Sequence, residues 1–92
     1  MSDSYNFFLK GKNSILDFSV DWTLWLGDDS LSAVEWSVPS GITKVDESFS
    51  TTMATIWLSG GMLGNSYDLV CSITTVFGRI DSRTITIIIR DR

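Results

Sequence analysis

The sequence predicts an all-β fold, an Ig-like antiparallel β-sandwich of about seven short strands. Apolar and polar side chains alternate with a period of two along several segments, which is typical of strands with one buried face. Turn-forming residues interrupt these segments about every 8–12 residues, the spacing expected of a small sandwich. No segment keeps a helical period over several turns. The length of 92 residues suits one domain.

The alternation assigns the strands and the faces that they bury. Residues 14–20 form the first clear strand, Trp22 continues its apolar face, and residues 21–26 can form a helical turn. Trp36 lies on the apolar face of the next strand and is the favoured central tryptophan of the core. The predicted strands cover residues 14–20, 31–38, 50–58, 67–77 and 83–90, and a shorter extended piece covers residues 42–45.

The last two strands predict an antiparallel hairpin that turns at Gly78 and Arg79. The isoleucines of this hairpin that we expect in the core are Ile85, Ile87 and Ile89. Tyr67, which follows a Gly-Asn-Ser turn, resembles the tyrosine corner of Ig-like domains. The single cysteine, Cys71, excludes the disulfide of antibody domains and is expected to be a buried small apolar residue.

Residues 1–13 predict an N-terminal arm or a first strand, ahead of an Ig-like sandwich domain over residues 14–92. The first segment is rich in aromatic side chains, and chain ends are usually disordered unless something holds them in place. Two interpretations remain open. The segment is a short strand or a frayed end, or it is an arm that docks on another chain.

Composition excludes several classes of function. The chain has no histidine, which removes the commonest general base and the commonest transition-metal ligand. A net charge of -4 without a basic cluster argues against nucleic acid as a partner. No segment has the length and hydrophobicity of a membrane span, and the start does not read as a secretion leader. We therefore expect no catalytic residue, no metal site, no cofactor and no membrane partner.

Two acidic pairs, Asp28-Asp29 and Asp46-Glu47, could in principle hold Ca²⁺ or act in acid–base chemistry. The first pair follows a glycine, as turn residues commonly do, and the second fits a solvated loop. Neither pair has the spacing of a known metal or phosphate motif. We therefore expect structural roles for both pairs.

Exposed aromatic and apolar residues are the better candidates for function. Four tryptophans are more than a small core needs, and Trp25 and Trp57 are the ones expected at the surface. For Trp25 a second interpretation stays open, in which it caps one end of the sandwich. Tryptophan is enriched at binding hot spots. Ile88 lies on the outward face of the last strand, which suggests that another chain or a neighbouring strand covers that strand. The candidate protein-interface residues are Tyr5, Phe7, Phe8, Trp25, Trp57, Ile88 and Arg90.

Several motifs follow one another in a specific order and spacing. They are residues 15–22 (ILDFSVDW), 25–26 (WL), 36–42 (WSVPSGI), 57–61 (WLSGG), 64, 67, 73–75 (ITT) and 78–85 (GRIDSRTI). Together they closely resemble a family of small tailed-phage proteins, described as phage fibre-tail adaptor proteins or phage structural proteins, over residues 10–90. That family typically has an acidic, proline-containing start, where this chain has residues 10–13 (KGKN).

The resemblance implies a non-enzymatic virion structural protein that joins a tail fibre or other tail component to the phage tail or head-tail connector. Its partners would be other phage structural proteins, and several copies would surround a symmetric assembly. It would be synthesised in the host cytoplasm and reside in the virion, at the tail or the head-tail junction. Two alternatives remain open: a capsid decoration or head-completion protein, and a glycan- or receptor-binding module in which Trp25 or Trp57 stacks on sugars.

Overall fold

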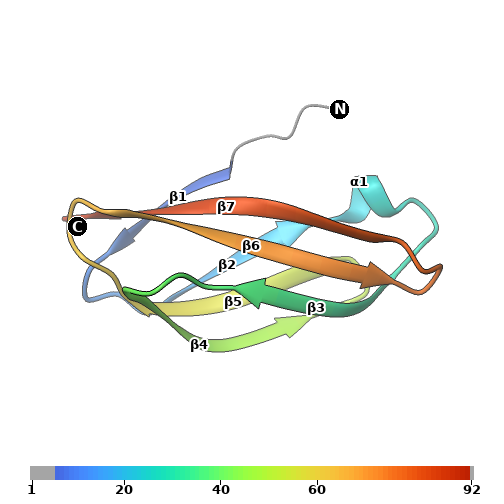
Figure 1. The fold of residues 1–92 in the computed structure, drawn as a ribbon, viewed down its shortest axis with the longest axis horizontal. Coiled ribbons are helices and arrows are strands. Elements are labelled where there is room, and N and C mark those ends of the chain that lie inside the picture. Colours follow the sequence, from blue (N-terminus) through green and yellow to red (C-terminus); the bar gives the residue numbers. More distant parts are fainter. Residues whose placement is uncertain (1–5, 92) are drawn as a thin grey trace.

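The computed structural model describes residues 6–91 as two β-sheets packed face to face, with one helical turn (Figure 1). The elements are β1 (Asn6–Gly11), β2 (Leu16–Asp21), α1 (Thr23–Leu26), β3 (Leu31–Ser37), β4 (Ile42–Phe49), β5 (Met53–Gly60), β6 (Ser66–Thr75) and β7 (Ile80–Arg90). One sheet has the order β1-β7-β6-β3 and the other the order β2-β5-β4. Only β1 and β7, among the described strand pairs, run parallel. The predicted all-β sandwich is confirmed.

The core forms where the alternating apolar positions of the two sheets face each other. The buried residues on these alternating apolar faces are Phe18, Val20, Ala54, Ile56, Leu58, Tyr67, Leu69, Cys71, Ile73, Ile85, Ile87 and Ile89. Three further residues of the same pattern are only partly buried: Leu16, Val34 and Val38. Trp36 is buried as well, with 8% of its surface exposed. Trp22, between β2 and α1, is buried more fully, at 0%, so the core holds both tryptophans.

Strand β4 is longer than the extended piece predicted over residues 42–45. Its ladder with β5 continues to Phe49 across an irregularity between Lys44 and Asp46. Asp46 and Glu47 therefore lie within a strand, and the prediction of a solvated loop there is wrong. The strand tolerates these charges because it is the edge of its sheet, where every residue after Ile42 stays exposed.

The turn of the β6–β7 hairpin also differs from the one predicted from the sequence. The predicted strand over residues 67–77 ends instead at Thr75, and β7 begins at Ile80, three residues before the predicted start. The amide of Val76 bonds to the carbonyl of Ser30, at 2.9 Å, rather than to β7. This leaves residues 76–79 as a turn, with Gly78 in the left-handed region at φ 89°.

The segment before residue 13 contributes a strand to the larger sheet. In the parallel ladder of β1 and β7, Leu9 is the partner of Ile88, so a neighbouring strand occupies the edge of β7. The Lys10 ammonium is buried and donates hydrogen bonds to the carbonyls of Gly11 and Gly60, at 2.8 and 2.7 Å, which ties β1 to the end of β5. The boundary proposed at residue 13 stays a prediction.

Tyr67 closes the end of the sandwich opposite α1. Its hydroxyl accepts a hydrogen bond of 3.0 Å from the Met62 amide, the contact that defines a tyrosine corner. A Cβ on Gly41 would lie 2.9 Å from the Tyr67 ring, and one on Gly61 would lie 2.6 Å from Ile89. Both glycines have φ near +100°, so a side chain there would be both strained and crowded.

Replacing Tyr67 by phenylalanine is expected to lower the free energy of unfolding by about 1 kcal/mol, because the amide of Met62 loses its acceptor while the ring stays in place. Urea unfolding followed by circular dichroism measures this loss. An unchanged midpoint and slope would contradict a stabilising role for the hydroxyl.

Candidate functional site

The β6–β7 turn and α1 lie at the same end of the sandwich (Figure 1). Four exposed apolar side chains belong to these two segments and to the start of β7. The exposed fractions are 100% for Leu24, 65% for Val76, 70% for Phe77 and 76% for Ile80. These are four of the five most exposed large apolar side chains in the described part of the chain. We call this end of the sandwich, with its four exposed apolar side chains, the hairpin end. Burying such a surface against a partner would be favourable.

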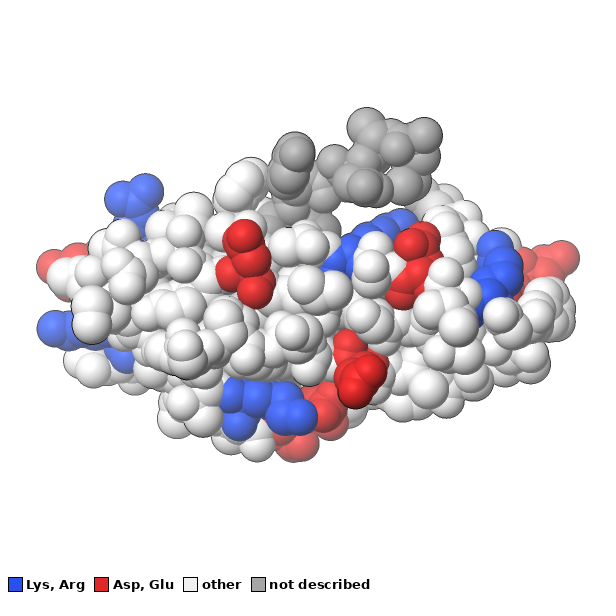
Figure 2. Space-filling view, in the orientation of Figure 1, with Lys and Arg blue, Asp and Glu red and all other residues white. Residues whose placement is uncertain are grey.

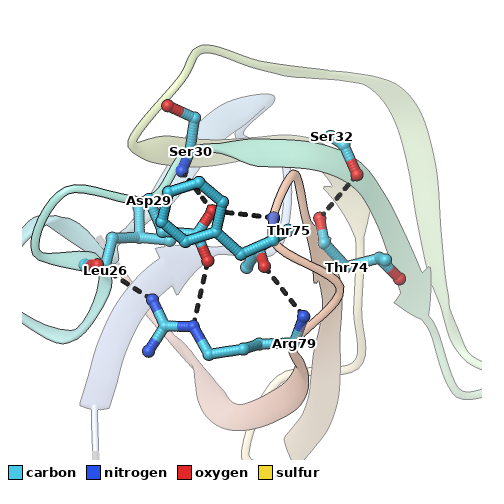
Figure 3. A network of polar contacts seen from close by, with 8 residues as sticks. Leu26, Asp29, Ser30, Ser32, Thr74, Thr75 and Arg79 are labelled. Atoms are coloured by element: carbon cyan, nitrogen blue, oxygen red, sulfur yellow. Dashed lines mark hydrogen bonds and ion pairs between the residues drawn. The ribbon is translucent and has the colours of Figure 1, made fainter.

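A buried carboxylate holds the hairpin end together (Figure 3). Asp29, in the loop before β3, accepts hydrogen bonds from the amide of Ser30 at 2.8 Å and the amide of Phe77 at 3.1 Å. Its other oxygen accepts one of 2.9 Å from Nε of Arg79. Nη2 of Arg79 donates to the carbonyl of Leu26 at 2.8 Å, so a single arginine links the β6–β7 turn to α1.

The turn also closes on itself. The amide of Thr75 donates to the carbonyl of Arg79 at 2.8 Å, and the amide of Arg79 donates to the hydroxyl of Thr75 at 2.9 Å. The amide of Gly78 bonds to the carbonyl of Thr75 at 3.0 Å. Together with the bonds to Asp29 and Ser30, these contacts fix a turn whose apolar side chains stay in solvent.

Hydrogen bonds from neighbouring residues stabilise the negative charge on Asp29. Burial alone would raise its pKa, but hydrogen bonds from Thr75, Ser30, Arg79 and Phe77 outweigh that effect and lower the pKa from 3.8 to about 2. The two residues of the Asp28-Asp29 pair therefore differ. Asp28 is exposed, whereas Asp29 is a buried anchor.

Trp25 lies beneath this network rather than fully at the surface. The Arg79 guanidinium is 4.2 Å from the centre of its ring, and Trp22 meets it edge-on at 5.3 Å. Trp25 is half-buried and packs against the core. This position fits the interpretation in which Trp25 caps one end of the sandwich better than the one in which it stands exposed. Its role in an interface stays a prediction.

The N-terminal candidates separate onto two faces. Phe7 and Leu9 are exposed on the outer face of the larger sheet, where Leu9 pairs with Ile88. Phe8 points the other way, and its ring centre lies 5.4 Å from that of Phe18 in the core. Arg90 ends β7 in an exposed position beside Gly11. The candidate Tyr5 lies outside the described residues.

Trp57 occupies the outer face of the smaller sheet, as the sequence suggested, and is 39% exposed. The strand registers place it between Asp17 on β2 and Asp46 on β4. The structure therefore brings Phe7 and Ile88 onto one sheet face, leaves Trp57 on another, and places Trp25 at the hairpin end. Whether any of them contacts a partner stays a prediction.

Sequence reasoning missed the hairpin end. It placed Val76 and Phe77 inside a strand and did not single out Leu24 or Ile80. A signal was nevertheless present, because Val76 and Phe77 are bulky apolar residues directly before a glycine turn, where polar residues are usual.

Charged side chains are scattered among uncharged ones on the face shown in Figure 2. Within residues 6–91, no three carboxylate or thiol side chains gather where they could hold a metal ion. The helical element that the structure describes, α1, has four residues, far fewer than a membrane span requires.

Comparisons with known proteins give a family and a fold. Among solved structures, the chain is similar to the solution structure of the PKD domain from the KIAA 1837 protein, with a TM-score of 0.56. The sequences are 11% identical, and the match covers 96% of this chain and 81% of that one, so it supports the sandwich fold alone. No curated protein matches this chain.

The family match covers nearly the whole sandwich. A sequence model of the family described as podophage GP4 fiber-tail adaptor protein gp77 matches residues 10–88, from the end of β1 through most of β7. It spans both sheets and the complete hairpin end. The chain therefore belongs to this fibre-tail adaptor family and is a phage tail structural protein.

Proposed function

We propose that this chain is a non-enzymatic adaptor that joins a tail fibre or another tail component to the phage tail or the head-tail connector. The observation that carries the proposal is the family match over residues 10–88. It covers the folded domain itself, which supports a joining role for this sandwich.

The geometry supports an adaptor because the domain offers separate surfaces for separate partners. The hairpin end lies at one end of a molecule that extends 41 Å along its longest axis. The apolar strip of Phe7, Leu9 and Ile88 lies on the outer face of the larger sheet. Two partners could thus be held at once by one rigid body.

Several copies would be arranged around the symmetric tail, with other phage structural proteins as partners. Adaptors at such a position must match the rotational order of the assembly. The virion is then the place where the chain acts, at the tail or the head-tail junction.

Deleting the gene from the phage tests this role. We expect the mutant particles to lack a fibre or another distal tail protein, and a plasmid copy of the gene to restore it. Quantitative mass spectrometry of purified particles and electron cryomicroscopy measure the outcome. Particles with a complete set of other proteins and normal infectivity would contradict the proposal. Density for the chain on the capsid surface would favour a decoration protein instead.

One observation favours a second candidate, a glycan- or receptor-binding module. Trp57 is partly exposed between two carboxylates, and an aromatic ring beside carboxylates can stack on a sugar while the carboxylates accept hydrogen bonds from its hydroxyl groups. Binding of the purified chain to a glycan array, lost in Trp57→Ala while particle assembly persists, would support it. No binding by the wild-type chain would exclude it.

A further inference from the structure

We propose that the hairpin end is the docking surface for another virion protein, and that this partner presents an apolar pocket bordered by lysine or arginine. The inference rests on the adaptor role and deepens it by naming the surface and the chemistry of its partner. The apolar members of the surface are Leu24, Val76, Phe77 and Ile80.

The first argument is rigidity. Hydrogen bonds from the turn to Asp29 and Ser30 hold the backbone of Val76 and Phe77, and the Asp29–Arg79 ion pair braces the far side of the turn. A surface that is already ordered loses little conformational entropy on binding.

The second argument is size and composition. The four side chains are more than 60% exposed, and together they present on the order of several hundred Å² of apolar surface, against the roughly 800 Å² that each partner gives to a standard interface. Phe77, at the tip, has the large rigid ring that suits an anchor in a partner's pocket.

The third argument is charge. The only arginine in the turn, Arg79, is already paired with Asp29. Asp28 is exposed and forms no ion pair among the described residues, and Asp81 directly follows Ile80. Arg83 also lies near this end, where it stacks on Trp22 and donates to the carbonyl of Asp21. The carboxylates of Asp21, Asp28 and Asp81 outnumber it, so the charge left beside the apolar surface is negative on balance. This charge favours a partner with a basic rim, because such a rim speeds encounter and fixes orientation.

The same charges disfavour the other occupants. A second copy of this chain, itself at net charge -4, that docked through the same surface would bring Asp28 and Asp81 against the same residues. An anionic lipid surface would repel them in the same way. The geometry thus points to a basic, apolar-lined site on a different protein of the particle.

The test uses particles purified from the deletion phage, to which the purified full-length chain is added back. Phe77→Ala is compared with Met62→Ala, because Met62 is 66% exposed but lies in the β5–β6 connection, away from the hairpin end. We expect the wild-type chain and Met62→Ala to bind alike, and Phe77→Ala to bind about tenfold more weakly or worse. Chain retained per particle is measured by quantitative mass spectrometry, and unfolding curves establish that both variants are folded.

Equal binding by Phe77→Ala and the wild-type chain would overturn this inference and leave the adaptor role intact. If the wild-type chain itself does not bind to the particles, the adaptor role fails and this inference falls with it. The two failures are therefore distinguishable.

The charge argument has its own test. Reversal of both acids, Asp28→Lys with Asp81→Lys, is expected to weaken binding to the particles at low salt, and the difference should shrink as salt is added. A photo-crosslinking residue at position 77 is expected to capture a different virion protein at a peptide rich in lysine or arginine. Tighter or unchanged binding by the charge variant, or crosslinks only to a second copy of the chain, would overturn the inference.

Discussion

Replacement of Trp22 by alanine is expected to lower the free energy of unfolding by about 3–5 kcal/mol. The indole is fully buried, meets Trp25 edge-on at 5.3 Å, and carries the Arg83 guanidinium 4.3 Å above its ring. Alanine would leave a cavity where the core meets α1. A domain of this size has a total stability of about 5–15 kcal/mol, so the loss is a large part of it.

The matched control is Trp57→Ala. This tryptophan is on the outer face of the smaller sheet and 39% exposed, so its removal should cost less than about 1–2 kcal/mol. Chemical unfolding followed by circular dichroism measures both variants without relying on tryptophan fluorescence. Similar losses in Trp22→Ala and Trp57→Ala would contradict the assignment of Trp22 to the buried core.

The sandwich could be predicted because its strands carry a local signal. A period of two places Leu69, Cys71 and Ile73 on one side of β6 whatever the partner strand is, and the structure buries all three. The same parity places Trp22 with the apolar face of β2. The alternation could not predict that Trp22 is buried more fully than Trp36, because the extent of burial depends on which residues of the other sheet lie opposite.

Strand β4 was harder to predict because its pattern is set by an edge position. Lys44 and Glu47 lie opposite Leu58 and Ile56 of β5, on the side that faces the core in a central strand. Here they remain exposed and form an ion pair with each other. Charges at such positions hinder the pairing of an exposed edge strand with another chain. In the sequence, the same charges interrupt the apolar alternation and therefore predict a loop.

The hairpin end could not be predicted from the sequence, because it depends on contacts between distant parts of the chain. Asp29 and Arg79 are 50 residues apart, and nothing near Asp29 in the sequence distinguishes it from Asp28. Only when β3 and β6 pair does the loop before β3 come to lie beside the β6–β7 turn. The exposure of Phe77 follows from the contact between this loop and the turn. The Phe77 amide donates a hydrogen bond to Asp29, which turns the chain away from the ladder of β6 and β7.

Replacement of Asp29 by asparagine is expected to lower the melting temperature at neutral pH by about 5–10 °C. The amide can still accept bonds from Ser30 and Phe77, but the ion pair with Arg79 is lost inside a site that excludes water from the carboxylate. The β6–β7 turn would lose its brace against α1. Asp28→Asn is the control, because that neighbour is exposed and its replacement should leave the melting temperature nearly unchanged.

The pH dependence of the difference in melting temperature between the wild-type chain and Asp29→Asn distinguishes the contribution of the Asp29 charge from that of its packing. Its pKa is about 2 in the folded chain and 3.8 ordinarily, so between these values the unfolded chain binds more protons. The stabilisation by the charged form is therefore complete above about pH 4 and is lost as the pH falls from 4 to 2. We expect the gap in melting temperature between the wild-type chain and Asp29→Asn to be constant from pH 7 to 5 and to narrow in that acidic window. A gap that persists unchanged to pH 2 would mean that packing, and not the charge, is what Asp29 contributes to the hairpin end.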